Sequence, residues 1–294
     1  MFDWKEHRVF PSKFDYVAAH TVDEAIAAKA AGDDVRFLAG GQSLLPMMKT
    51  RLATPAKLVD INGIPGLDLL ERSNGHLRVG ALVRHAAIVR SDLTFGAVES
   101  AAPWISDPLV RNRGTLCGSV AHCDPEGDWN SVLLATGADV VARGANGERV
   151  IPITAFVVDF FTNSLAEDEM VIEVRIPVPA GPSGGSYQKL ERKVGDYATV
   201  AVAGHLELAG DGTIARAGVA LTAVAPMNTK VTAAEQLLVG KQPSDELFAE
   251  AGELAAQASA PHDDVRGSAE WKRNVVRVFT RRALAAASAQ AQGQ

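Results

Sequence analysis

The stretch Val35-Arg36-Phe37-Leu38-Ala39-Gly40-Gly41-Gln42-Ser43-Leu44-Leu45 decides most of what the sequence says about the fold. Its first four residues have the composition of a short buried strand, and Ser43 is a suitable N-cap for a helix that runs to Lys49. Residues 57–61 are the next strand candidate. The order strand, glycine turn, helix and strand predicts a unit in which backbone N–H groups of the turn approach an anionic ligand.

A second glycine-rich segment, Gly114-Thr115-Leu116-Cys117-Gly118-Ser119, lies far away in the sequence. It also combines glycines with hydroxyl side chains, so it is a second candidate for binding phosphate through backbone N–H groups. We expect a turn here, because no long apolar strand enters the segment and helices are predicted on both sides. Two such segments predict a ligand with two phosphate groups.

Length and composition predict a folded globular protein, because the chain has 294 residues, of which 47% are hydrophobic and 22% charged. Its net charge of −6 argues against a nucleic-acid-binding protein, which needs a basic surface to neutralise phosphates. The N-terminus lacks the apolar stretch of a signal peptide, and no apolar run is long enough to cross a bilayer. We therefore expect a cytoplasmic protein.

The chain has two cysteines, Cys117 and Cys123, which are too few for a disulfide framework or for an iron-sulphur cluster with its usual four thiolates. One dense group of polar side chains resembles a metal site, but it lacks the paired thiols or histidines of zinc sites. We therefore predict no metal site. The members of the group are His122, Cys123, Asp124, Glu126 and Asp128.

Two carboxylates of that group have simpler roles. Asp124-Pro125 suits a turn, and Asp128 suits the N-cap of a helix over residues 129–136. A carboxylate at this place could also bind hydroxyl groups of a ligand held at the second glycine segment. The two roles are compatible.

Prolines and glycines crowd together in residues 177–185, which marks the best candidate for a domain boundary. We predict an N-terminal domain over residues 1–178 with two subdomains that meet near residue 60, a linker over 179–185, and a C-terminal domain over 186–288. In the C-terminal domain, apolar runs on both sides of Gly210-Asp211-Gly212 predict a hairpin, although the stretch formally matches a dinucleotide-binding pattern. Helices are predicted over 231–238, 245–257 and 269–287.

Just after the linker, Tyr197 follows a Gly-Asp turn that can project its aromatic ring. The ring could stack on a planar heterocycle or pack at a domain interface, and the sequence does not separate the two. Lys189, upstream of this turn, could be a solvated strand residue or a cation directed at an electron-rich ring.

Three stretches together resemble the FAD-binding medium subunit of molybdenum hydroxylases, most closely that of the aerobic carbon monoxide dehydrogenase type. They are residues 37–49, residues 113–119 with Asp124-Pro125 and Asp128, and residues 189–197. The resemblance covers nearly the whole chain. It implies an α+β fold with a two-subdomain FAD-binding domain of the PCMH and vanillyl-alcohol-oxidase type, followed by a smaller C-terminal domain of a sheet with helices.

The resemblance also implies a function. FAD would be bound non-covalently, while the molybdenum cofactor and the [2Fe-2S] clusters would lie on a large and a small partner subunit, in a dimer of heterotrimers. The chain would accept electrons from the clusters and pass them to an external acceptor. We expect no catalytic acid or base in this oxidoreductase subunit, and a cytoplasmic complex that can lie at the inner face of the membrane. The substrate would be selected on the large subunit.

The residues that the resemblance assigns to FAD fall into two groups. One group would hold the pyrophosphate, and the other would lie near the cofactor, with Tyr197 covering one face of the isoalloxazine, Lys189 in contact with the flavin and the Met170 backbone at the ring system. The first group is Ala39, Gly40, Gly41, Gln42, Ser43, Thr115, Cys117, Gly118 and Ser119; the second is Asp124, Asp128, Met170, Lys189 and Tyr197.

Cys117 departs from the family pattern, which usually has a glycine there. If that position needs a positive φ, we expect Cys117 to strain the segment by roughly 1 kcal/mol. Two other functions stay open at this point. A stand-alone flavin oxidase or dehydrogenase would use the same pocket for a small organic substrate, and a non-enzymatic assembly module would carry a vestigial cofactor site.

Overall fold

The computed structural model describes residues 10–293, and its first subdomain is a three-stranded parallel sheet with the strand order β1-β3-β2. The predicted unit of strand, glycine turn, helix and strand is present. Thr21 opens the first helix, because its hydroxyl accepts the N–H of Glu24 at 3.1 Å. The elements are β1 (Asp15–Ala18), α1 (Val22–Ala30), β2 (Val35–Leu38), α2 (Leu44–Lys49) and β3 (Lys57–Asp60).

The second subdomain is built on a five-stranded antiparallel sheet in the order β4-β5-β10-β6-β7. Two hairpins, β4-β5 and β6-β7, contribute to this sheet, and at the first one Asn74 and Gly75 have the positive φ values of 51° and 76° that a tight hairpin turn needs. The strands are β4 (Leu70–Ser73), β5 (His76–Gly80), β6 (Asp139–Gly144), β7 (Gly147–Pro152) and β10 (Met170–Pro177).

Helices connect β5 to β6, and a short helix with one small hairpin connects β7 to β10. The helix predicted over residues 129–136 is present and begins one residue earlier, at Asp128. The elements are α3 (His85–Arg90), α4 (Gly96–Ala101), η1 (Ala102–Trp104), α5 (Pro108–Arg113), α6 (Leu116–His122), α7 (Asp128–Thr136), α8 (Ile153–Phe156), β8 (Val157–Asp159) and β9 (Thr162–Asn163).

The C-terminal part is a four-stranded antiparallel sheet followed by three helices. Gly212, with φ 82°, lies in the turn between β12 and β13, so the hairpin interpretation of Gly210-Asp211-Gly212 is confirmed. The first strand begins at Ser183, inside the predicted linker. The elements are β11 (Ser183–Leu190), β12 (Val200–Leu208), β13 (Ile214–Thr222), β14 (Thr229–Lys230), α9 (Thr232–Leu238), α10 (Asp245–Ala258) and α11 (Ala269–Ala291).

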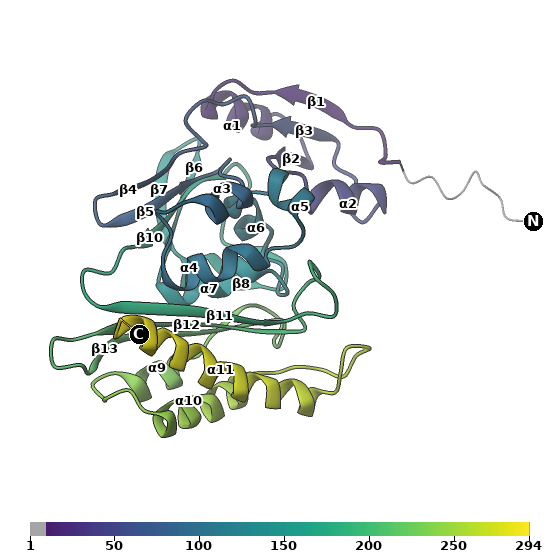
Figure 1. Ribbon diagram of the computed structural model, residues 1–294. Coiled ribbons are helices and arrows are strands. Elements are labelled where there is room, and N and C mark those ends of the chain that lie inside the picture. The colour runs from purple at the N-terminus through teal and green to yellow at the C-terminus, as the bar shows by residue number, and fades with distance from the viewer. Residues whose placement is uncertain (1–9, 294) are drawn as a thin grey trace, which may run out of the picture.

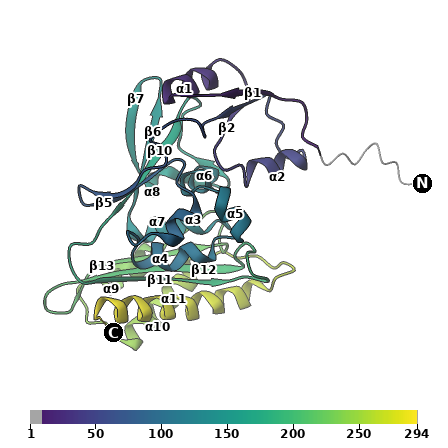
Figure 2. The ribbon, with the colours of Figure 1, turned by 45° about the horizontal axis from the view of Figure 1, so that its top comes forward.

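The sheet of the C-terminal part lies between two layers of helices, as Figure 1 and Figure 2 show. Helices α9 and α11 cover one face, with α10 packed against both of them, and α4 and α7 of the preceding part cover the other. Glycines make this packing close: a Cβ at Gly185 would meet the Ala97 nitrogen of α4, and one at Gly218 would meet the Ala135 carbonyl of α7. The two predicted domains therefore share a core, and the boundaries at 178 and 186 stay a prediction.

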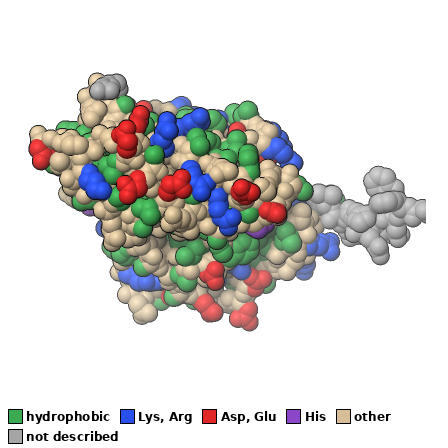
Figure 3. Space-filling view, turned by 90° about the horizontal axis from the view of Figure 1, so that it is seen from below, with side chains coloured by type: hydrophobic (Ala, Val, Ile, Leu, Met, Phe, Trp, Pro, Cys, Tyr) green, Lys and Arg blue, Asp and Glu red, His purple; other side chains and the backbone are tan. Residues whose placement is uncertain are grey.

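The underside of the molecule carries mixed charge. Figure 3 views the molecule from below, the side of α10 and α11 in Figure 1, and shows basic and acidic side chains interspersed on that face. Within residues 10–293, no helix is long and apolar enough to cross a membrane.

Candidate functional site

The two glycine segments, far apart in sequence, touch in the structure. A Cβ at Gly40 would meet the Arg113 carbonyl oxygen and would lie 2.7 Å from the Gly114 Cα. Only glycine permits this approach of backbone to backbone. The next residue, Gly41, has φ 71°, a left-handed conformation that side chains with a Cβ rarely adopt.

Arg84 links the two segments from one side. Its guanidinium donates to the Arg113 carbonyl and to the Asn62 side-chain oxygen, both at 2.5 Å. Asn62 in turn donates to the Ala39 carbonyl at 2.9 Å, which fixes the start of the first segment. Burial, and then the neighbouring charge of Arg113, lower the pKa of Arg84, while Asp60 opposes this shift. Two guanidinium groups close together beside the glycines favour an anionic ligand.

His85 packs against Gly114 of the second segment. Its backbone N–H donates to the Gly114 carbonyl at 3.0 Å, and a Cβ at Gly114 would lie 2.8 Å from the His85 ring. The ring accepts a hydrogen bond at Nδ1 from the indole N–H of Trp129 at 3.1 Å. Burial lowers the pKa of His85 to about 3, so its ring is neutral at pH 7. This packing holds Gly114 against Gly40.

The second glycine segment runs into α6, so the expectation of a turn is wrong beyond Thr115. The Thr115 hydroxyl caps this helix by accepting the Gly118 N–H at 3.1 Å. Cys117 has helical backbone and is buried; its thiol donates to the Val79 carbonyl at 3.4 Å. The expected strain is therefore absent, because the positive φ in this region belongs to Cys123, with 51°. Burial raises the pKa of the Cys117 thiol well above its usual range.

Asp128 has a different role from the one predicted. It is the first residue of α7, and Gly127 occupies the N-cap position. Its buried carboxylate accepts hydrogen bonds from the Tyr187 hydroxyl at 2.6 Å and from Lys189 Nζ at 3.1 Å. The N-cap prediction is wrong because two strong donors from β11 bind this carboxylate. Burial raises the pKa of Asp128, and the charge of Lys189 opposes the shift.

Lys189 is not a solvated strand residue, since only 1% of its side chain is exposed. Besides Asp128, its ammonium donates to the Trp104 carbonyl at 3.0 Å and lies 3.5 Å from Glu191 Oε2. A buried ammonium needs such partners to offset the loss of water. Lys189 therefore lies at the meeting point of β11, η1 and α7.

Tyr197 and Asp124 lie together at the far end of α6 from Thr115. Asp124 forms the predicted turn, because its carboxylate accepts the Glu126 N–H at 2.9 Å. Burial, followed by the charges of Asp124 and Glu126, raises the pKa of Tyr197 to about 12. Nearly half of Tyr197, 47%, remains exposed, so part of its surface is open to contact with a ligand.

The remaining predicted residues are placed as follows. Gln42 donates to the Gly40 carbonyl at 3.1 Å, and Ser43 precedes α2 without a capping hydrogen bond from its side chain. Met170 is buried at the start of β10, opposite Arg143 of β6, in the strand that packs against α6. The structure thus joins the two glycine segments directly, pairs Asp128 with Lys189, and places Asp124 near Tyr197.

Asn62, Arg84 and His85 also belong to this site, although the sequence did not predict them. None of them lies in a glycine-rich or otherwise recognisable motif, and Arg84 and His85 stand at the N-cap and first residue of the short helix α3. Their roles follow from contacts with residues distant in sequence. No local sequence signal marks Arg84-His85, because residues 81–83 separate them from the end of β5.

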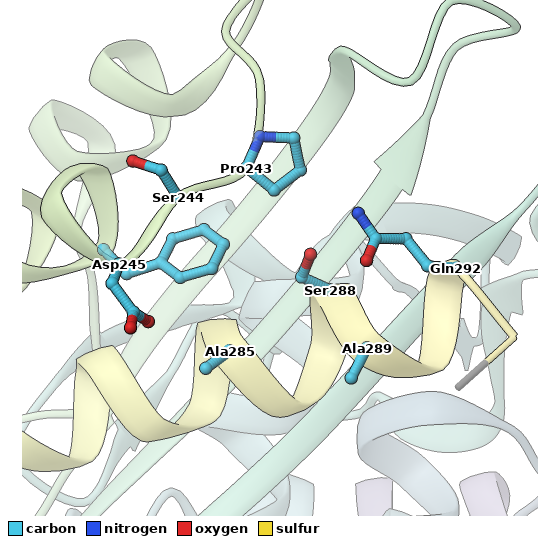
Figure 4. Close-up of a pocket in the computed structure, with 8 residues that line it drawn as sticks. Pro243, Ser244, Asp245, Ala285, Ser288, Ala289 and Gln292 are labelled. Carbon is cyan, nitrogen blue, oxygen red and sulfur yellow. The ribbon is translucent and has the colours of Figure 1, made fainter.

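A separate cavity of about 200 Å³ lies between the start of α10 and the end of α11 (Figure 4). Ser244 at its edge already caps α10 by accepting the Leu247 N–H at 3.2 Å. None of the predicted site residues lines this cavity. Within residues 10–293, no group of three or more His, Cys, Asp or Glu side chains is arranged to hold a metal ion.

Comparison with known families gives two matches that together span most of the chain. Residues 12–179 match the FAD binding domain in molybdopterin dehydrogenase, and residues 185–287 match the CO dehydrogenase flavoprotein C-terminal domain. The family resemblance and the α+β fold class predicted from the sequence are confirmed.

Individual relatives align with this chain over nearly the whole length of both proteins. The carbon monoxide dehydrogenase medium chain of Hydrogenophaga pseudoflava is 36% identical over 95% of this chain and 98% of its own. The 6-hydroxypseudooxynicotine dehydrogenase complex subunit alpha of Paenarthrobacter nicotinovorans is also 36% identical, over 94% of this chain and 95% of its own.

Solved structures agree with this. Carbon monoxide dehydrogenase from Hydrogenophaga pseudoflava superposes with a TM-score of 0.92 at 38% identity, over 96% of this chain and 99% of that one. The residues here suit the cofactor, because the two glycine segments meet backbone to backbone and the Arg84 guanidinium, close enough to Arg113 to feel its charge, donates to the Arg113 carbonyl at this meeting point. The chain belongs to the FAD-binding flavoprotein subunits of the molybdenum hydroxylase family, and it is an oxidoreductase subunit.

Proposed function

We propose that this chain carries FAD in a molybdenum hydroxylase of the carbon monoxide dehydrogenase type and transfers electrons through it. The observation that carries the proposal is the contact of Gly40 with the Arg113-Gly114 backbone, close to the two positive charges of Arg84 and Arg113. Bound FAD would supply the redox chemistry, taking electrons from iron-sulphur clusters and giving them to an external acceptor. The clusters and the molybdenum cofactor would lie on a small and a large partner, in a dimer of heterotrimers.

The pyrophosphate would bind where the two glycine segments meet. Backbone N–H groups of both segments can approach an anion closely, and the hydroxyls of Ser43 and Thr115 lie at the starts of the following helices. Arg84 and Arg113 would offset the negative charge. The residues assigned here are Ala39, Gly40, Gly41, Gln42, Ser43, Thr115, Cys117, Gly118 and Ser119.

The flavin ring would lie toward the other end of α6. This helix begins directly after Thr115 and ends at His122, just before Asp124, so its seven residues span about 10 Å. A ligand that extends along α6 would pass from the glycines to Asp124 and Tyr197. We assign Asp124, Asp128, Met170, Lys189 and Tyr197 to this end of the site.

The protein's own residues would then position the cofactor and leave the proton chemistry of substrate oxidation to a partner. Tyr197 would cover the ring and limit access of water, and the buried Lys189 would place a positive charge near it. Electron transfer needs a fixed distance between redox centres, and the close packing of α6 against β10 provides a rigid support.

The first experiment is purification of the chain together with its partners. We expect flavin absorbance corresponding to one FAD per chain, and release of intact FAD on denaturation because no covalent bond is formed. A complex without flavin would support the assembly-module function instead. Oxidation of an organic substrate by the isolated FAD-loaded chain would support the stand-alone oxidase or dehydrogenase.

The substrate is assigned separately. Relatives named for carbon monoxide and for a nicotine derivative are equally identical to this chain, which fits a substrate chosen on the large subunit. We expect the complex to reduce a dye with carbon monoxide as the electron donor. If an N-heterocycle reduces the dye and carbon monoxide does not, the assignment of carbon monoxide as substrate is wrong, and the proposed role of the flavin is unaffected.

The location of the complex also belongs to the proposal. We place it in the cytoplasm, with the complex able to associate peripherally with the inner face of the membrane. Fractionation of cells in low and high salt tests this: a peripheral complex is released by salt, whereas a protein found only outside the cytoplasm would contradict the assignment.

A further inference from the structure

Lys189 lies between two carboxylates, Asp128 and Glu191, so this buried junction carries more negative than positive charge. The Lys189 ammonium donates hydrogen bonds to the Trp104 carbonyl and to Asp128 Oδ2, and it forms an ion pair with Glu191 Oε2 at 3.5 Å. Only 9% of the Glu191 side chain is exposed, and its Oε2 makes no hydrogen bond. The charge of the Lys189 ammonium therefore offsets the cost of burying this carboxylate oxygen.

The other oxygen of Glu191 holds the turn that carries Tyr197. Glu191 Oε1 accepts the N–H of Gly195 at 3.2 Å, and Gly195 has φ 85°. The same glycine is fixed from the opposite side, since the Ser106 hydroxyl donates to its carbonyl at 3.3 Å. Glu191 therefore contacts both Lys189 and the turn that leads to Tyr197.

Each carboxylate beside Lys189 has a second anchor. Tyr187 donates its hydroxyl to Asp128 at 2.6 Å, and Gly195 donates its N–H to Glu191. If the Lys189 ammonium turns toward a ligand, Asp128 therefore keeps the hydrogen bond from Tyr187, and Glu191 keeps the one from Gly195. Glu191 thus influences both the direction of the Lys189 ammonium and the position of the turn at Gly195.

We propose that Glu191 is a positioning residue for the flavin end of the site, holding the Lys189 ammonium with one oxygen and the Tyr197 turn with the other. This inference rests on the proposed function, because it assumes that Lys189 and Tyr197 face the flavin. Glu191 does not touch the ring in this arrangement. It acts through the two residues that do.

The test is Glu191→Gln in the full chain within its complex. Glutamine retains an oxygen for the Gly195 N–H, but it removes the negative charge and places an NH₂ donor opposite the Lys189 ammonium. We expect FAD to bind about tenfold more weakly, because the buried ion pair that positions the Lys189 ammonium is lost. The midpoint potential of bound FAD should rise, because removing a nearby negative charge favours the reduced, more negative flavin.

Glu235 offers a matched control in the same part of the protein. Its Oε1 accepts the Val219 N–H at 3.0 Å, and its Oε2 lies 3.3 Å from Lys230 Nζ. Glu235→Gln makes the same chemical change on α9, so it should leave both the FAD affinity and the potential unchanged. Equal shifts in both variants would overturn the proposal, because the effect would then be general destabilisation.

A second measurement keeps the proposal testable if Glu191→Gln does not fold. In wild-type full-length protein, the Gly195 amide should exchange its hydrogen slowly with and without FAD, because its acceptor belongs to the protein. Rapid exchange in the FAD-free protein would overturn the proposal. Wild-type protein that binds no FAD would instead refute the proposed function, whereas FAD bound unchanged by Glu191→Gln refutes only the role of Glu191.

Discussion

The first glycine segment requires its glycines, whereas the second accommodates a buried cysteine. At Gly40 a Cβ would collide with backbone atoms of Arg113 and Gly114, which cannot move aside as a side chain can. Cys117 is a residue of α6 with ordinary helical backbone, and its side chain fills part of the core. Two similar glycine-rich sequences thus have different structural roles. The first allows two backbones to approach closely, and the second begins a packed helix.

This difference shows that a glycine's importance depends on what lies opposite it. A Cβ added at Gly118 would be close only to the Thr115 hydroxyl, at 2.7 Å, because the helix leaves the surrounding space open. Gly40 faces a segment that is distant in sequence and close in space. Substitutions in the two segments should therefore differ in kind, and in size, as the following experiments test.

The largest effect is expected for Gly40→Val. The branched side chain would push residues 113 and 114 away from the first segment, and overpacking of this kind destabilises by about 2 kcal/mol or more. FAD should be lost from the purified protein, as measured by the ratio of flavin to protein absorbance. Gly32→Val is the control, since a Cβ there has only ordinary contacts with Val35 and Lys57. Retention of FAD by Gly40→Val would show that the segments do not act together.

A pH effect is expected from His85, which supports Gly114. Its pKa is about 3 in the folded protein and about 6.5 when unfolded, so between these values the unfolded state binds the extra proton. The resulting stability is present above pH 6.5 and is lost as the pH falls toward 3. Between pH 6.5 and 5, the free energy of unfolding should decrease by about 2 kcal/mol.

Denaturant unfolding at several pH values measures this dependence. His85→Asn should flatten the slope between pH 6.5 and 5, although it also lowers stability at pH 7 because Trp129 loses its acceptor. His20→Asn, at an exposed position, should keep the wild-type slope. An unchanged slope in His85→Asn would mean that another group titrates in this range.

Arg84→Met should weaken FAD binding about tenfold, because one charge-assisted contact beside the pyrophosphate is lost together with the bridge from Asn62 to Arg113. Arg84→Lys should recover only part of the affinity, since an ammonium cannot reach both acceptors as a guanidinium fork does. Titration of the FAD-free protein with FAD measures both variants. Arg90→Met, at an exposed position at the end of α3, is the control. Equal affinity in Arg84→Met and wild type would remove Arg84 from the site.

Local pattern in the sequence accounts for much of the fold but only for part of the site. The unit around Gly40 and the hairpins at Asn74-Gly75 and Gly212 are visible because turn chemistry is local. By contrast, β1 has no buried residue, so it carries no periodic signal. The pairing of Asp128 with Lys189 depends on how β11 packs against α7, which no short stretch of sequence encodes.

Cys117→Gly should have the smallest effect, and it tests the comparison most directly. Glycine inside a helix is less favourable by roughly 1 kcal/mol, and the buried thiol is lost as well, so the variant should be less stable while FAD affinity stays the same. Cys123→Gly is the matched change, because Cys123 caps the same helix with φ 51°, where glycine relieves strain. The midpoint temperature of thermal unfolding should be lower for Cys117→Gly than for Cys123→Gly. The reverse order, or tighter FAD binding by Cys117→Gly, would mean that the second segment behaves like the first and needs a glycine at position 117.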